Sequence, residues 1–150
     1  MHSRQAKEAR MKDLVARLRE REGRVTPQRL AVIRALLNNA NHPSAEDIYR
    51  ELKAEFPTMS FATVYKTIDK LKAMGEILEL QFRDGSNRYD GMRPTPHTHL
   101  GCTSCGKIID LEVSPPTGPV ANAAKQLGFR LISMRFDMYG TCAECRRQHA

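Results

Sequence analysis

Four cysteines, arranged as two Cys-x-x-Cys pairs, constrain this chain more than any other feature of its sequence. Cys102 and Cys105 form the first pair, Cys142 and Cys145 form the second, and the chain contains no further cysteine. Each pair can direct two thiolates at one point, and two pairs supply the four ligands of a tetrahedral zinc ion. The spacing therefore predicts a structural four-cysteine zinc site that leaves no coordination position open for catalysis.

Other interpretations of the cysteines remain open. A thioredoxin-like dithiol would need only one pair at a strand-to-helix junction, and a pair of disulfides would need an oxidising compartment. Neither of these uses the symmetry of two matched pairs. An iron-sulfur cluster is expected with different cysteine spacings. Structural zinc is the favoured interpretation.

Length and charge set broader limits. A chain of 150 residues can hold two small domains, because a module pinned by zinc needs only a modest core. No stretch approaches the roughly 18 apolar residues of a membrane span, and the N-terminus lacks the apolar segment of a secretory signal, so we expect a cytoplasmic protein with no membrane partner. The formal net charge of +7 suits an anionic partner but is also common in soluble proteins.

The first half of the chain has the periodicity of helices. Residues 4–22 carry a narrow apolar stripe among mixed charges, which predicts an amphipathic helix that contacts either DNA phosphates or solvent alone. Thr26 and Pro27 predict the start of a second helix that runs to about Leu37. Ser44 and Asp47 predict the capping box of a third helix, whose apolar side we expect to extend to Phe56.

A fourth helix is expected between Ser60, its N-cap, and Gly75, where it ends. Its apolar face is predicted to comprise Phe61, Val64, Ile68 and Leu71. Small, hydroxyl and basic residues lie elsewhere on its surface near the N-terminus, and a helix, a short turn and such a helix suit insertion into a major groove. The candidate DNA-binding residues are Ala62, Thr63, Tyr65 and Lys66.

The period then changes to that of strands. Apolar and polar residues alternate over 77–82, and residues 84–87 are of types that favour turns. Residues 88–90 can form the returning strand, so the segment predicts a hairpin. Helices followed by a hairpin are typical of a winged helix-turn-helix module, although a generic small α+β domain remains an alternative. Beyond a proline-containing hinge we expect a strand over 107–113, a short helix within 119–128 and a longer strand region over 129–139.

Histidines and carboxylates form a second candidate site. If their segment is extended, His97 and His99 project from the same face and can share a metal, although a surface pair without metal is the alternative. His42 lies in the loop before the third helix and Asp90 ends the hairpin. Asp110 interrupts an apolar strand and needs a cation or hydrogen bonds if it is buried there, unless it simply faces outward.

Taken together, these motifs resemble the ferric uptake regulator superfamily of bacterial metal-dependent repressors, over almost the whole chain. The resemblance rests on the two cysteine pairs and on Val25-Thr26-Pro27-Gln28-Arg29, His42-Pro43-Ser44, Ala62-Thr63-Val64-Tyr65-Lys66, Arg88-Tyr89-Asp90, His97-Thr98-His99, Ile108-Ile109-Asp110 and Tyr139-Gly140. It implies an α+β protein with a winged-helix DNA-binding domain over 1–91, a hinge over 92–96 and a small α/β dimerisation domain with the four-cysteine zinc site over 97–150. It also implies a homodimer.

The resemblance further implies a regulatory metal on His42, Asp90, His97, His99 and Asp110. Three nitrogen and two oxygen donors favour Fe²⁺ or Mn²⁺ over a sulfur-seeking metal. Iron-sensing members typically have Glu where this chain has Asp110, and an acidic residue where it has Thr98. These departures favour the peroxide-responsive branch over iron, zinc or nickel sensing. In that branch, the resemblance implies oxidation of His42 and His97 to 2-oxo-histidine.

The sequence thus predicts a metal-dependent transcriptional repressor, not an enzyme, that binds pseudo-palindromic double-stranded operator DNA and senses peroxide. An iron-responsive or other metal-uptake repressor is the main alternative. A non-haem iron enzyme would use the same histidines and carboxylate but gives no role to the exposed face of the fourth helix. A zinc-carrying storage or interaction protein is a further possibility.

Overall fold

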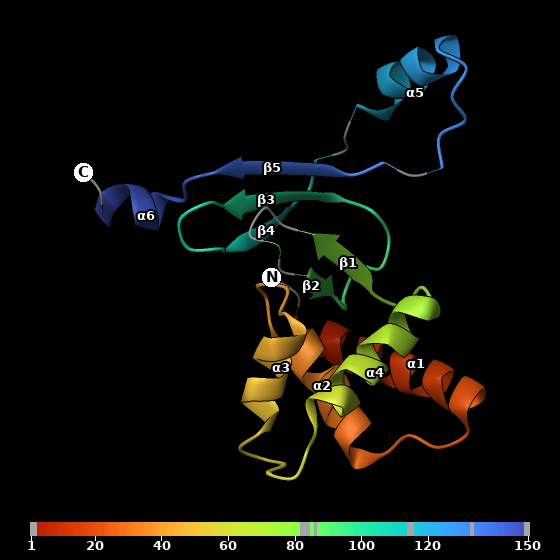
Figure 1. Cartoon of the computed structure of the whole chain (residues 1–150), viewed down its shortest axis with the longest axis vertical. Coiled ribbons are helices and arrows are strands. Elements are labelled where there is room, and N and C mark those ends of the chain that lie inside the picture. The colour runs from red at the N-terminus through yellow and green to blue at the C-terminus, as the bar shows by residue number, and fades with distance from the viewer. Residues whose placement is uncertain (1–2, 82–84, 86, 114–115, 133, 149–150) are drawn as a thin grey trace. The chain divides into compact units, whose positions relative to one another are not determined.

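The computed structural model describes residues 3–81, 85, 87–113, 116–132 and 134–148 (Figure 1). The chain divides into two structural units, Met1–Thr95 and Pro96–Ala150. Among the described residues, every helix is too short or too polar to span a bilayer.

The first two helices of the N-terminal unit have the bounds that their caps predict. Helix α1 (Arg4–Glu22) begins at Ser3, whose side chain accepts a hydrogen bond from the Ala6 N–H. Helix α2 (Pro27–Asn38) begins at Thr26, with proline at its first turn. Leu14 and Leu18 of α1 are fully buried in the same core as six residues of α2, namely Ala31, Val32, Ile33, Ala35, Leu36 and Leu37.

Helices α3 (Ala45–Leu52) and α4 (Phe61–Ala73) complete the helical layer. The predicted capping box is confirmed, since Ser44 and Asp47 exchange hydrogen bonds between side chain and backbone. The predicted extension of α3 to Phe56 is wrong. The helix ends at Leu52, and the Phe56 N–H bonds back to the Leu52 carbonyl at 2.8 Å in a separate turn that leaves the phenyl ring packed against the core.

The predicted hairpin is also present. Strands β1 (Leu78–Gln81) and β2 (Asn87–Asp90) pair antiparallel, with Leu78 opposite Asp90. Residues 84 and 86 of the predicted turn lie outside the described residues, and Asn87 is the first residue of β2. The hairpin therefore follows the helices in the order of a winged helix-turn-helix module, with Tyr89 buried in the helical core.

The C-terminal unit contains a three-stranded sheet in the order β4, β3, β5 (Figure 1). Strand β3 (Thr98–Cys102) lies in the centre, antiparallel to β4 (Ile108–Leu111) and parallel to β5 (Phe136–Gly140). The predicted strand-helix-strand order therefore omitted the central strand. Both predicted strands were too long, because only the segments that pair with β3 form ladders. An isolated sequence cannot show that limit.

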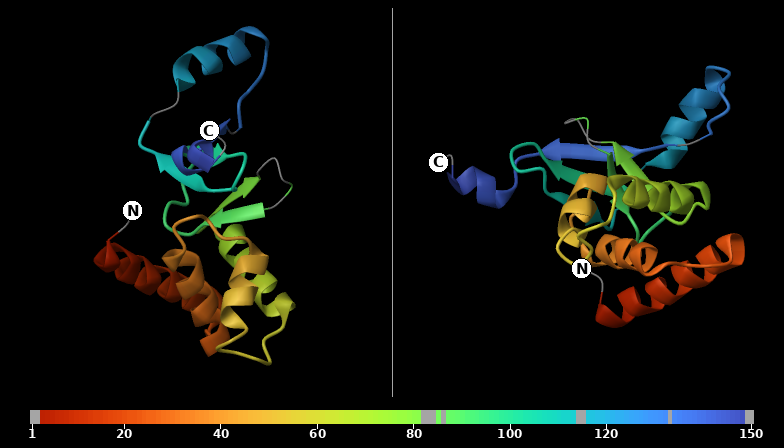
Figure 2. Two further views of the ribbon diagram at one scale, coloured as in Figure 1. Left: turned by 90° about the vertical axis from the view of Figure 1, so that its left-hand side faces the viewer. Right: turned by 60° about the horizontal axis from the view of Figure 1, so that its bottom comes forward.

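The C-terminal unit also contains two helices. Helix α5 (Thr117–Gln126) falls within the region where a short helix was expected, and it stands away from the sheet with no buried residue (Figures 1 and 2). Helix α6 (Ala143–Gln148) was not predicted, and it carries the buried Cys145. Large apolar side chains remain exposed across this unit: Ile109, Val113, Val120, Leu127, Phe129, Leu131, Ile132, Met138 and Tyr139.

Candidate metal centres and nucleic-acid interface

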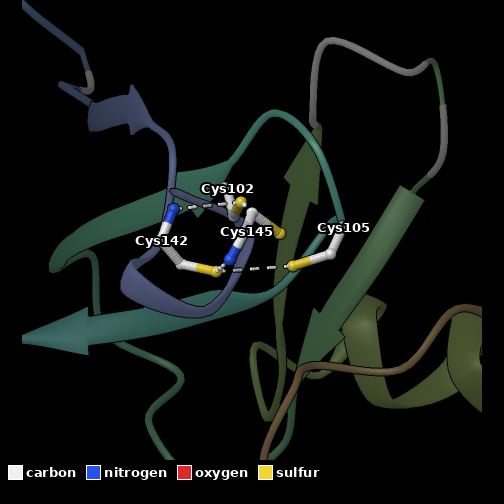
Figure 3. A group of neighbouring side chains, drawn as sticks. All are labelled: Cys102, Cys105, Cys142 and Cys145. Carbon is white, nitrogen blue, oxygen red and sulfur yellow. Dashed lines mark hydrogen bonds between the residues drawn. The ribbon is translucent and has the colours of Figure 1, made fainter. Parts of the chain in front are cut away.

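The four cysteines converge at one end of the sheet (Figure 3). Cys102 ends β3 and Cys105 follows in the loop to β4, while Cys142 precedes α6 and Cys145 lies in it. The Sγ atoms of Cys102 and Cys145 are 3.9 Å apart, as are those of Cys105 and Cys142. All four side chains are free thiols. Two segments distant in the sequence thus supply one compact group of sulfur donors.

Local backbone geometry explains how each pair points inward. Gly106 adopts a positive φ of 70°, which lets the chain turn tightly after Cys105 while its N–H bonds to the Cys102 carbonyl at 3.0 Å. At the other pair, the Cys142 N–H, just before α6, points toward the Cys102 sulfur at 3.3 Å, and the Cys145 N–H, in the first turn of α6, points toward the Cys142 sulfur at 3.5 Å. The Cys142 N–H donor favours thiolate at Cys102.

The cysteine pKa values show the effect of this crowding. Backbone N–H donors from Cys142, Cys105 and Ser104 lower the pKa of the Cys102 thiol to about 6. Hydrogen bonding to the neighbouring thiols of Cys142 and Cys105 raises the pKa of Cys145 to about 12. A tetrahedral zinc with bonds of about 2.3 Å places its sulfurs about 3.8 Å apart, which matches the observed 3.9 Å.

A second group of donors lies within the same unit. The Nε2 atoms of His97 and His99 are 3.4 Å and 3.8 Å from the same Asp110 carboxylate oxygen, and the two rings have centroids 4.2 Å apart. Thr98 and His99 belong to β3 and His97 directly precedes it, and both rings face the same carboxylate oxygen. Ligands on one cation with bonds of about 2.1 Å lie about 3.0 to 4.2 Å apart, so each histidine nitrogen lies at the distance from the Asp110 oxygen that is expected of two ligands on a shared metal.

Asp137 lies beside this group, and no sequence pattern indicated a role for it. Its carboxylate is 3.2 Å from Nδ1 of His99, the ring nitrogen that does not face Asp110. The two residues are paired across the parallel strands β3 and β5. The missing signal was the register of these strands, which no local pattern in residues 129–139 reveals.

His42 and Asp90 lie together in the N-terminal unit. Nδ1 of His42 is 4.0 Å from Oδ1 of Asp90, and the two side chains are 8% and 2% exposed. That oxygen also accepts hydrogen bonds from the backbone N–H groups of Met92 at 2.7 Å and Arg93 at 3.0 Å. The loop that follows β2 thus fixes the carboxylate close to the imidazole. These are the two residues of the predicted donor set that the N-terminal unit contributes.

The predicted DNA-binding residues lie at the N-terminal end of α4. Ala62, Tyr65 and Lys66 are exposed, whereas Thr63 is half-buried and its hydroxyl lies 3.0 Å from that of Ser60. Phe61 was assigned to the apolar face of this helix, but it is 37% exposed and forms edge and tilted contacts with Tyr49 and Tyr65. The surface therefore carries an aromatic cluster beside Lys66.

Comparisons with known proteins agree with this architecture. The model of the "Ferric uptake regulator family" matches residues 20–139. The "Peroxide operon regulator" of Bacillus subtilis (strain 168) is 37% identical over 138 residues, which cover 92% of this chain and 94% of the relative.

Solved structures of similar chains point the same way. A Streptococcus pyogenes structure described as "Structural basis for peroxide sensing and gene regulation by PerR" is 34% identical, covers 90% of this chain and 92% of its own, and superposes with a TM-score of 0.52. The Helicobacter pylori ferric uptake regulator Fur, described with "three functional metal binding sites", is 25% identical over 93% of each chain with a TM-score of 0.72.

Proposed function

Because this chain belongs to the ferric uptake regulator family, we propose that it is a metal-dependent, DNA-binding transcriptional repressor that releases its operator in response to peroxide. The observation that carries the proposal is the convergence of His97, His99 and Asp110 at the spacing of ligands on one cation. This group is separate from the four cysteines, which form a complete donor set of their own. The similarity to peroxide-responsive repressors is the reason for proposing peroxide as the signal that this chain detects.

The four cysteines bind one structural Zn²⁺ per chain in this proposal. Their sulfur separations of 3.9 Å fit tetrahedral zinc, and all four coordination positions are filled by protein. The zinc links the loop after β3 to the start of α6, so it stabilises a unit whose helix α5 contributes no buried residue. This metal holds the unit together and leaves the response to peroxide to the other site.

The regulatory cation, Fe²⁺ or Mn²⁺, is held by His42, Asp90, His97, His99 and Asp110. This set combines the N-terminal pair with the C-terminal group, as the family resemblance implies, and its mixed nitrogen and oxygen donors suit these metals. A cation bound by both groups restrains a winged-helix domain over 1–91 relative to a dimerisation domain over 97–150, with a hinge over 92–96. That restraint allows the two α4 helices of a dimer to contact the two half-sites of the operator at the same time.

Peroxide sensing follows from the same ligands. Bound Fe²⁺ would catalyse cleavage of the peroxide O–O bond without a net loss of electrons, so the imidazole ring of His42 or His97 is the two-electron reductant. In the net reaction, one oxygen of the peroxide is added to a ring carbon of His42 or His97 and the other leaves as water. The resulting 2-oxo-histidine is a poorer ligand. Because His42 belongs to the DNA-binding domain, its oxidation frees that domain from the restraint and weakens operator binding.

DNA contact is assigned to the start of α4, through Ala62, Thr63, Tyr65 and Lys66. The exposed aromatic cluster and Lys66 offer both base or sugar contacts and a phosphate partner. A homodimer supplies two such helices for a pseudo-palindromic operator. The exposed apolar residues on α5 and directly after it, including Val120, Leu127 and Phe129, support an interface with a second copy of the chain. The protein acts in the cytoplasm, where its DNA target lies.

Iron-responsive repression is the second candidate, since the chain also resembles the Helicobacter pylori ferric uptake regulator. One experiment separates the candidates. The protein is purified without air and loaded with either Fe²⁺ or Mn²⁺, and operator binding is measured before and after a stoichiometric pulse of hydrogen peroxide. We expect both metals to promote binding and only the iron form to lose it.

The other outcomes of this experiment are equally specific. If both metal forms keep their operator after the pulse, iron-responsive repression replaces peroxide sensing. If neither metal changes operator affinity, the chain is not a metal-dependent repressor.

A further inference from the structure

The imidazole of His99 lies between two carboxylates. Asp137 Oδ1 is 3.2 Å from its Nδ1 atom, and Asp110 Oδ1 is 3.8 Å from its Nε2 atom. The His99 side chain is only 1% exposed, and that of Asp137 is 15% exposed. One ring nitrogen therefore makes a hydrogen bond of ordinary length, while the other faces its carboxylate at a distance too long for one.

This arrangement determines which nitrogen carries hydrogen. An ionised carboxylate can only accept, so the hydrogen bond to Asp137 requires a hydrogen on Nδ1 of His99. In the neutral ring, Nε2 then presents its lone pair on the side of Asp110. Nε2 of His99 and the Asp110 oxygen are both electron-rich, so a cation close to both is favoured. A neutral imidazole that presents the lone pair of Nε2 is a form of histidine that binds metals.

Strand pairing holds Asp137 in place. His99 and Asp137 occupy directly paired positions in the parallel ladder of β3 and β5. The second oxygen of Asp137 accepts a hydrogen bond from Nη2 of Arg135 at 3.0 Å. Both carboxylate oxygens of Asp137 thus accept a hydrogen bond, one from the Arg135 guanidinium and one from the buried His99 ring.

We propose that Asp137 is a positioning residue that fixes the Nδ1–H tautomer and the orientation of His99, so that Nε2 is presented to the regulatory cation. The inference rests on the proposed function for the identity of that cation. Hydrogen bonds of this kind, from the second nitrogen of a metal-binding histidine to a carboxylate, orient the ring and raise its basicity as a ligand, and their loss costs about 10 to 100-fold in metal affinity.

The first test measures Mn²⁺ affinity by competition with a fluorescent chelator, using full-length protein that retains its zinc. Asp137→Ala is expected to bind Mn²⁺ about 10 to 100-fold more weakly than the wild type. Asp137→Asn should recover part of the loss, because its amide oxygen can still accept the His99 hydrogen bond. Arg135→Ala leaves that hydrogen bond in place, so it should change affinity much less than Asp137→Ala.

A matched control removes one negative charge elsewhere in the same unit. Glu144→Gln does so at a side chain that is 63% exposed and 3.6 Å from Lys107, and it should bind Mn²⁺ like the wild type. Zinc content and dimer mass are measured for every variant, so that a structural defect is recognised. Wild-type Mn²⁺ affinity in a folded Asp137→Ala variant would overturn the proposal, as would an equal loss in Glu144→Gln.

The second test reads the tautomer directly and needs no regulatory metal. Nitrogen-15 NMR of histidine-labelled, zinc-containing protein should show His99 with hydrogen on Nδ1, and Asp137→Ala should shift or lose that signal. A wild-type His99 with hydrogen on Nε2 overturns the inference. Failure of the wild type to bind Mn²⁺ would instead overturn the proposed function, while the NMR result would still decide the hydrogen bond.

Discussion

Arg88 holds the backbone of His42 in an uncommon left-handed conformation. His42 has a φ of 50°, the one positive value among the described residues other than glycine. The Arg88 side chain donates from Nε to the His42 carbonyl at 2.5 Å and from Nη2 to the Asn41 carbonyl at 2.8 Å. Such a backbone costs about 1 to 3 kcal/mol and persists only where its surroundings enforce it. The proposed metal ligand is thus positioned by a residue of the neighbouring hairpin.

The first prediction concerns this restraint. Arg88→Ala should weaken Mn²⁺ binding by about 10-fold or more, because His42 loses the hydrogen bonds that fix its loop. Circular dichroism should show the helices intact, since the core does not include Arg88. The control is Arg4→Ala, which removes an equally charged side chain that is 94% exposed. If both variants bind Mn²⁺ like the wild type, Arg88 has no part in the metal site.

The second prediction concerns the zinc. Cys142→Ser removes one of four ligands, and structural zinc can contribute on the order of 10 kcal/mol to folding. We expect the variant to lose its zinc and the C-terminal unit to unfold, which leaves monomer or aggregate. Zinc content and size-exclusion chromatography with light scattering measure this. A stable, zinc-free dimer of the variant with all four cysteines changed to serine would contradict a structural role.

The third prediction separates two kinds of DNA contact on α4. Lys66→Ala should weaken binding to all sequences and reduce the salt slope by about one unit, as expected for the loss of one phosphate contact. Tyr65→Ala should mainly reduce discrimination between operator and unrelated DNA. Tyr65→Phe keeps the ring and tests the hydroxyl alone. Binding that is unaffected in all three variants would mean that another surface meets DNA.

Local chemistry made the helices of the N-terminal unit predictable. Thr26 with Pro27 and Ser44 with Asp47 satisfy the first N–H groups of α2 and α3, and these signals lie within four residues in the sequence. The exposure of Phe61 was not predictable in this way. Its spacing matched the apolar face of α4, but its contact with Tyr49 comes from a different helix.

The C-terminal unit was less predictable because its contacts are not local. Strand β3 contains a glycine and two potential metal ligands, His99 and Cys102, and its apolar and polar residues do not alternate clearly. Only its pairing with β4 and β5 therefore defines it as a strand. The four cysteines of this unit could still be assigned to one site from their spacing alone. Asp137 could not, since its role depends on its register opposite His99.

The last prediction concerns the chemistry of sensing. A brief pulse of hydrogen peroxide on the iron form should add one oxygen to the peptide that contains His42 or His97, and operator DNA should be released in proportion. The manganese form should keep both its DNA and its unmodified histidines, because Mn²⁺ in this site reacts poorly with peroxide. The cysteines should react more slowly when they are bound to zinc.

Oxidation of Met138 serves as an internal control that distinguishes oxidation at the metal site from general oxidative damage. Met138 is 46% exposed, and a freely diffusing oxidant would convert it to the sulfoxide in both metal forms. His97 has a side chain that is only 6% exposed, so its modification ahead of Met138 requires an oxidant formed beside it. Tandem mass spectrometry of the two peptides gives the ratio. Release of DNA with oxidation confined to cysteine or Met138, or equal sensitivity of the manganese form, would exclude this mechanism and favour iron-responsive repression.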